Sequence, residues 1–108
     1  MNNITDILVK AKALIDTPEK WIKGSNAEDG NGVVVSLEDK RAVCFCTVGA
    51  VLRVSEDIGV ECAALDLLYS FVKGEYDDIP EWNDTYNRTH AEVMAVFDKA
   101  IEISKEMK

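Results

Sequence analysis

Residues 89–104 read THAEVMAVFDKAIEIS, and this stretch carries a clear helix signal. Thr89 and Glu92 stand three residues apart, the spacing of a capping box, in which each side chain satisfies the backbone amide of the other residue. Apolar side chains then recur every three or four residues, which places them on one helix face. The expected inner face comprises Val93, Val96, Phe97, Ala100, Ile101, Ser104 and Met107. An amphipathic helix of this kind packs against other helices, so the stretch predicts an all-α fold.

Two earlier segments show helical periodicity as well. In residues 4–16 the apolar side chains form one stripe, made of Ile4, Ile7, Leu8, Ala11, Leu14 and Ile15. Residues 60–73 are apolar around most of the circumference, which is typical of a central, buried helix, and Gly74 ends the segment. With a further helix between these two, we expect a single compact domain over residues 1–108 with four main helices.

The chain after the first helix is expected to form an irregular insertion. Thr17 and Pro18 favour a single helical turn that carries Trp21, because threonine can cap a turn and proline fits its first position. Residues 25–32 are rich in Ser, Asn, Asp and Gly and are typical of a loop. Residues 33–35 are all valine, which favours a short β segment in this insertion.

The start of the second helix is open between two alternatives. A helix that begins near Ser36 would carry Asp39 at the third position, as in a capping box. A hairpin would instead pair residues 33–35 with residues 42–45, because the β-branched side chains favour strands. Both alternatives continue as helix after Thr47.

Composition excludes several classes of function. The 108 residues include 20 acidic and 12 basic side chains, and the net charge of −8 argues against direct binding of nucleic acid. No apolar run approaches the roughly 20 residues of a membrane span, so we expect no membrane contact. The first residues lack the basic segment of a signal peptide, which predicts a cytoplasmic protein, in the host cytoplasm if a phage encodes it.

The cysteines and the lone histidine do not suggest a reactive centre. Cys44, Cys46 and Cys62 are an odd number, which excludes complete disulfide pairing, and with His90 they match no common zinc motif. On a helix, Cys44 and Cys46 would point to nearly opposite faces. We expect three inert core residues, a solvent-facing His90 and neither metal nor cofactor.

Acidic residues concentrate in residues 75–84, where five carboxylates occur without a base: Glu75, Asp77, Asp78, Glu81 and Asp84. Such a run is compatible with a solvated loop that keeps the protein soluble. It also attracts a basic partner and raises the association rate. We therefore favour a non-enzymatic interaction module, such as a phage accessory or inhibitor protein. Its partner would be a host protein with a basic surface, bound by Glu75, Asp77, Asp78 and Glu81. A homo-oligomer is also compatible with the sequence.

A second hypothesis is a small-molecule-binding or hydrolytic domain. Cys46, Gly49 and Ala50 form a strip of small side chains, which allows another backbone or a large ring to approach closely. The pocket would lie between this strip and the polar residues that follow: Trp21, Trp82, Asn83, Asp84 and Arg88. The same residues can form a clamp that holds the loop, with Arg88 paired to Asp84. No catalytic constellation surrounds the strip, so an enzyme is the less favoured interpretation.

Three segments together resemble a known family. Residues 21–24, 42–50 and 82–93 contain, in order, a Trp-x-x-Gly, a Cys-x-x-Gly-Ala, an Asn-Asp and an Arg-Thr motif. This order and spacing resemble an uncharacterised family of small proteins from bacterial and phage genomes, from Trp21 to about Ala100. Lys40 stands where that family usually has a proline ahead of its second helix. The resemblance implies a single cytosolic domain and a phage origin, and it implies no activity.

Overall fold

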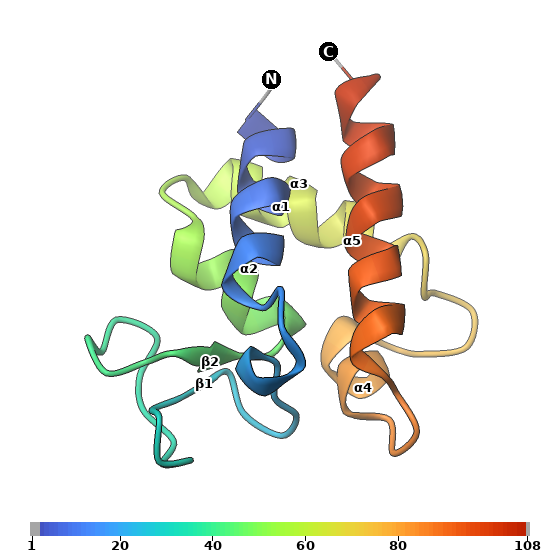
Figure 1. The fold of residues 1–108 in the computed structure, drawn as a ribbon. Helices are drawn as coiled ribbons and strands as arrows, with labels where there is room; N and C mark the ends of the chain where they lie inside the picture. The colour runs from blue at the N-terminus through green and yellow to red at the C-terminus, as the bar shows by residue number, and fades with distance from the viewer. Residues whose placement is uncertain (1–2, 108) are drawn as a thin grey trace.

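The computed structural model describes residues 3–107, and four main helices confirm the expected all-α class (Figure 1). The helices are α1 (Asn3–Leu14), α2 (Thr47–Val54), α3 (Ile58–Tyr69), the short α4 (Ile79–Asp84) and α5 (His90–Lys105). The insertion after α1 contains a 3₁₀ turn and two short strands, η1 (Pro18–Lys20), β1 (Ala27–Glu28) and β2 (Cys44–Phe45). Within residues 3–107, each helix is too short or too polar to cross a membrane.

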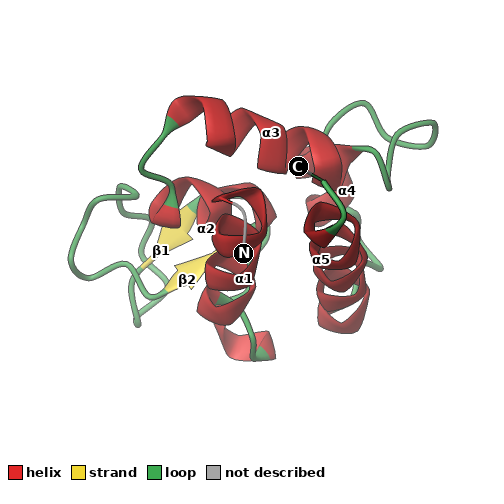
Figure 2. Cartoon of the chain, turned by 90° about the horizontal axis from the view of Figure 1, so that it is seen from above, coloured by secondary structure: helices red, strands yellow, loops and turns green. Residues whose placement is uncertain are grey.

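Helix α1 is the centre of the core, because it packs against α2, α3 and α5. Leu8, Ala11 and Ile15 on its apolar stripe are fully buried, as the helical spacing predicts. Helices α1 and α5 run side by side in opposite directions (Figure 1), and the hydroxyl groups of Thr5 and Ser104 join them at 2.6 Å. Seen from above, α3 lies across this pair (Figure 2).

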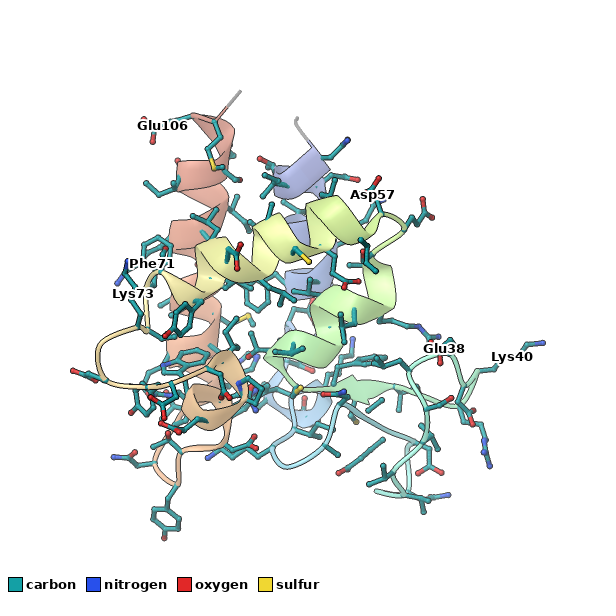
Figure 3. The ribbon with its side chains drawn as sticks, turned by 180° about the vertical axis from the view of Figure 1, so that it is seen from behind. Glu38, Lys40, Asp57, Phe71, Lys73 and Glu106 are labelled. Carbon is teal, nitrogen blue, oxygen red and sulfur yellow. The ribbon has the colours of Figure 1, made fainter. Side chains whose placement is uncertain are left out.

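Helix α3 is not the central helix that the sequence suggested. Only Ala64 and Leu68 of α3 are buried, whereas Ile58 is 78% exposed. Because α3 crosses the outer side of the α1–α5 pair, only a narrow face of it reaches the core (Figure 3). Its other apolar side chains, including Leu65 and Tyr69, remain partly exposed to solvent.

Both alternatives for residues 33–46 were wrong in part. The second helix begins only at Thr47, so no helix starts near Ser36. Strand β2 does form, but it pairs with β1 and not with residues 33–35: Ala27 lies opposite Phe45, and Glu28 lies opposite Cys44. Residues 33–35 lie along the other edge of β1, because the glycine-rich turn at residues 29–32 reverses the chain. Strand β1 therefore lies between the two segments that were expected to pair.

The apparent cap at Ser36 and Asp39 marks a turn instead of a helix start. The Asp39 amide donates to the carbonyl oxygen of Ser36, and the Asp39 carboxylate accepts from the amide and guanidinium of Arg41. These hydrogen bonds lower the pKa of Asp39 to about 2. From α2, the Arg53 guanidinium donates to the carbonyl groups of Leu37 and Asp39, which ties the turn to the helix.

The acidic segment was expected to be a loop, but it contains α4. Asp78 caps this helix, because its carboxylate accepts a hydrogen bond from the Glu81 amide at 2.8 Å. Pro80 lies in the first turn, where a missing amide costs nothing. Helix α5 begins with the predicted capping box of Thr89 and Glu92, and the Thr89 amide holds the pKa of Glu92 below its usual value. Two caps thus fix the helices on either side of residues 85–88.

Candidate functional site

The structure brings together most of the residues predicted to line a pocket, but it joins them around a buried asparagine. The side-chain oxygen of Asn83 accepts three hydrogen bonds, from Trp21 Nε1 at 2.7 Å, the Thr47 amide at 3.0 Å and Thr47 Oγ1 at 2.6 Å. Its Nδ2 donates to the Ile22 carbonyl at 3.1 Å and to Asp84 Oδ1 at 2.9 Å. Asn83 is fully buried, so its amide serves to join three chain segments.

Arg88 also serves the fold. Its guanidinium lies 4.6 Å from the centre of the Trp82 ring, and its Nε donates to the Trp82 carbonyl at 3.0 Å. A second guanidinium nitrogen donates to the Tyr76 hydroxyl at 2.9 Å. A third lies 3.3 Å from the Glu92 carboxylate on the next turn of α5. The forked group thereby holds the segment between α4 and α5 in place.

The expected pair between Asp84 and Arg88 is not formed. Helix α4 ends at Asp84 and the chain turns before α5, so the two residues are not one helical turn apart on a common face. Asp84 Oδ1 instead accepts a hydrogen bond from the Gly24 amide at 3.0 Å. Asp84 therefore anchors the turn after η1, while Glu92 is the carboxylate beside Arg88.

The strip of small residues faces a backbone and not an aromatic ring. A Cβ added to Gly49 would overlap the carbonyl oxygen of Asn26, so only glycine allows the residue before β1 to approach α2 this closely. Cys46 caps α2, because its sulfur accepts from the Gly49 amide at 3.2 Å. The same thiol donates to Asn26 Oδ1 at 3.5 Å. The strip thus packs the insertion against the helical core.

A small cavity of about 110 Å³ lies between the strip and α4. Its lining consists of Gly24, Ser25, Asn26, Cys46, Pro80 and Asp84. Among the five predicted pocket residues, only Asp84 lines this cavity. Trp82 and Asn83 are buried in the core, and the Trp21 side chain is hydrogen-bonded to Asn83. The volume is well below the roughly 300–1,000 Å³ of usual ligand sites. The residues around the strip therefore pack the insertion against the helices, and the cavity that they leave is smaller than a usual ligand site.

The carboxylates predicted to bind a partner are arranged differently. Glu75, Asp77, Asp78 and Glu81 are all exposed, and within residues 3–107 none of them pairs with a base. Asp77 and Asp78 line an open groove of about 450 Å³ between α3 and α4. The full lining is Val48, Leu65, Asp66, Tyr69, Asp77, Asp78, Ile79 and Pro80.

Sequence reasoning missed the groove residues contributed by α3, namely Leu65, Asp66 and Tyr69. The available signal was the apolar surface of residues 60–73, which is wider than one packing face requires. We interpreted that width as complete burial. The structure shows that part of this surface borders the groove.

Comparison with known proteins gives a family. Residues 1–103 match the model of a family of unknown function, DUF6197. The chain belongs to DUF6197. No match was found among curated proteins or among solved structures. The expected membership in an uncharacterised family is thus confirmed, while the phage origin stays a prediction.

In this DUF6197 chain the residues of the first two motifs make contacts that stabilise the fold. The Trp-x-x-Gly segment reaches α4 twice, through Trp21 to Asn83 and through Gly24 to Asp84. The Cys-x-x-Gly-Ala segment contacts Asn26, the residue before β1, through Cys46 and Gly49. These contacts join both segments to the rest of the fold.

The three thiols of the DUF6197 chain lie in different environments. Cys46 is buried and Cys44 is half-buried, and burial raises the pKa of both thiols. Cys62 is exposed on α3, so the expectation of three core cysteines was wrong at this position. It is wrong because α3 buries only a narrow face. Within residues 3–107, no three His, Cys, Asp or Glu side chains converge to hold a metal ion.

We expect Cys62 to be the fast-reacting thiol of the native chain. The thiolate is the reactive form, and burial keeps Cys46 protonated at neutral pH and out of reach of reagents. Maleimide labelling followed by peptide mass spectrometry should modify Cys62 first and Cys46 only after denaturation. Rapid modification of Cys46 in the folded protein would contradict both its burial and the expectation that it is an inert core residue.

His90 was expected to face solvent, but it is half-buried. Its Nε2 donates to the carbonyl oxygen of Ile15 at 2.7 Å, and its ring centre lies 6.3 Å from that of Trp21. The imidazole therefore links the first turn of α5 to the chain that leaves α1. Both contacts hold the ring within the fold.

Proposed function

We propose that this DUF6197 protein is a non-enzymatic interaction module that binds the basic surface of another protein through residues 75–81. A cytoplasmic site of action, and a host protein as target if a phage encodes the chain, belong to the same proposal. The observation that carries it is the concentration of four exposed carboxylates in one short segment, Glu75, Asp77, Asp78 and Glu81, none of which has a basic partner within residues 3–107. Six acidic side chains elsewhere do have a base within 4.0 Å: Asp6, Asp16, Asp39, Glu92, Asp98 and Glu102.

Neighbouring carboxylates without counter-charges repel one another, so folding alone gives no reason for this concentration of charge. Two of the four do have local roles, because Asp78 caps α4 and Glu81 Oε1 accepts from the Asp77 amide at 3.4 Å. Neither bond removes the negative charge from the surface. Exposed charge of one sign accelerates encounter with a basic partner, and this effect weakens with ionic strength.

The first test removes charge from the acidic segment. We expect the triple substitution Glu75→Gln, Asp77→Asn and Asp78→Asn to leave the melting temperature unchanged or slightly raised. Self-repulsion is relieved, and asparagine caps a helix about as well as aspartate does. The same variant should lose capture of the basic partner from a lysate of the source cell. With that partner purified, the loss should be mostly a slower association rate.

A matched control removes the same amount of charge elsewhere. Glu38, Glu56 and Glu106 are exposed and have no ion pair within residues 3–107, so their replacement by glutamine tests net charge alone. This control should retain the partner. Equal capture by the parent and the acidic-segment variant would overturn the proposal, and so would equal loss in both variants. Unfolding of the acidic-segment variant would show that the segment is structural.

A further inference from the structure

The groove between α3 and α4 combines an apolar lining with a negative edge. Leu65 and Tyr69 of α3 and Val48 of α2 are partly buried in it, and Ile79 of α4 is buried. Pro80 completes the apolar lining. The groove therefore offers apolar contact area for a single side chain and not for a broad apolar interface.

Three exposed carboxylates belong to the same groove, and its lining contains no basic residue. Within residues 3–107, the side chains of Asp66 and Asp77 have no ion pair and no hydrogen bond. Asp78 uses one oxygen to cap α4. The groove therefore offers apolar contact area together with unneutralised negative charge, contributed by α3, by α4 and by the segment that joins them.

We propose that this groove binds one aliphatic or aromatic side chain of a protein partner, with a lysine or arginine beside it that pairs with Asp66 and Asp77. The inference rests on the proposed function, because it names the contact point on the acidic surface. The apolar side chain would supply affinity, since a few buried anchors dominate most interfaces. The adjacent cation would supply orientation and speed of encounter.

The geometry argues against two other occupants. The groove is widely open to solvent, whereas sites for small molecules usually bury most of the ligand surface. A second copy of this chain would bring another net charge of −8 toward the same carboxylates. A segment of a basic protein has neither disadvantage, because its backbone can remain in solvent while one side chain enters the groove.

The test uses two short lysine-containing peptides of equal length and charge that differ only at the central residue, tryptophan or serine. Binding to the full chain is measured by calorimetry and by amide chemical shifts. We expect the tryptophan peptide to bind about tenfold tighter or better, an advantage of the size that one buried anchor supplies. Its chemical-shift changes should centre on Leu65, Tyr69 and Ile79.

A pair of variants on α3 locates the effect. Leu65→Gln changes the groove without changing charge, and it should remove the preference for tryptophan. Ile58→Gln is the matched control, because Ile58 lies on the same helix, is 78% exposed and does not line the groove. It should bind both peptides as the parent does. Melting curves of both variants show whether each remains folded, and the two peptides on the parent chain give a result even if one variant does not fold.

The outcomes separate this inference from the proposed function. Equal affinity for the two peptides, chemical-shift changes outside the groove, or no binding of either peptide would each overturn the groove as an anchor site. The proposed function is decided independently, by partner capture with the acidic-segment variant and its control. Loss of capture in that variant with equal peptide affinities would leave an acidic interaction surface without an apolar anchor.

Discussion

Gly49→Ala is expected to lower the free energy of unfolding by about 3 kcal/mol, the upper end of what overpacking usually costs. The added methyl group would overlap the carbonyl oxygen of Asn26, and this backbone atom cannot rotate away as a side chain could. Asn26, the residue before β1, would have to move away from α2. That separation would break the Cys46 hydrogen bonds, both from the amide to the Asn26 carbonyl and from the thiol to Asn26 Oδ1. Urea unfolding followed by circular dichroism measures the loss.

Gly30→Ala is the control for this substitution. A Cβ at Gly30 would meet no heavy atom within 4 Å, and Gly30 does not have a positive φ angle. Its free energy of unfolding should therefore stay within a few tenths of a kcal/mol of the parent, as surface substitutions usually do. If Gly49→Ala unfolds at the same urea concentration as Gly30→Ala, the insertion does not lie against α2 as described.

Asn83→Ala should be about as damaging, with a loss of about 3–5 kcal/mol. Truncation leaves Trp21 Nε1, the Thr47 amide and hydroxyl and the Ile22 carbonyl without their partner. Each buried polar group left unsatisfied costs about 1–3 kcal/mol, and water that enters the space recovers part of the sum. The loss is measured by urea unfolding.

Two further substitutions show whether the amide itself matters. Asn83→Asp keeps the shape but replaces the two donated hydrogen bonds with a buried charge that faces the Ile22 carbonyl and the Asp84 carboxylate, so it should destabilise strongly as well. Asn87→Ala changes an exposed asparagine in the same part of the chain and should have little effect. A loss below about 1 kcal/mol in both Asn83 variants would mean that the buried network contributes little.

Local sequence patterns predicted the features that depend on neighbouring residues. The capping box of Thr89 and Glu92 and the stripe of α1 were confirmed, because each is decided within a few turns of one helix. The start of α2 could not be read in this way. The β-branched side chains of residues 33–35 favour an extended conformation but do not say which strand they pair with. The pairing strand depends on the direction in which the glycine-rich turn sends the chain.

The candidate site was predicted as a set of residues but not as an arrangement. The sequence singled out Asn83, Asp84 and Arg88 as one polar cluster, and all three do make specific contacts. Their partners lie up to 62 positions away, at Trp21 for Asn83, so spacing along the chain could not identify them. The groove was missed for a related reason, since α3 and α4 form it only after both have packed against the core.

The buried amide of Asn83 also bears on how long the native state survives. Its partners at Thr47, Ile22 and Trp21 are separated from it by 36, 61 and 62 positions. Contacts between such distant segments require loop closure before they contribute any stability, so we expect this network to form after the folding transition state. In that case Asn83→Ala would accelerate unfolding strongly and slow refolding little, which stopped-flow measurements can separate. A single side chain that joins three segments would then determine how slowly the protein unfolds, while it would have little influence on how fast the protein folds.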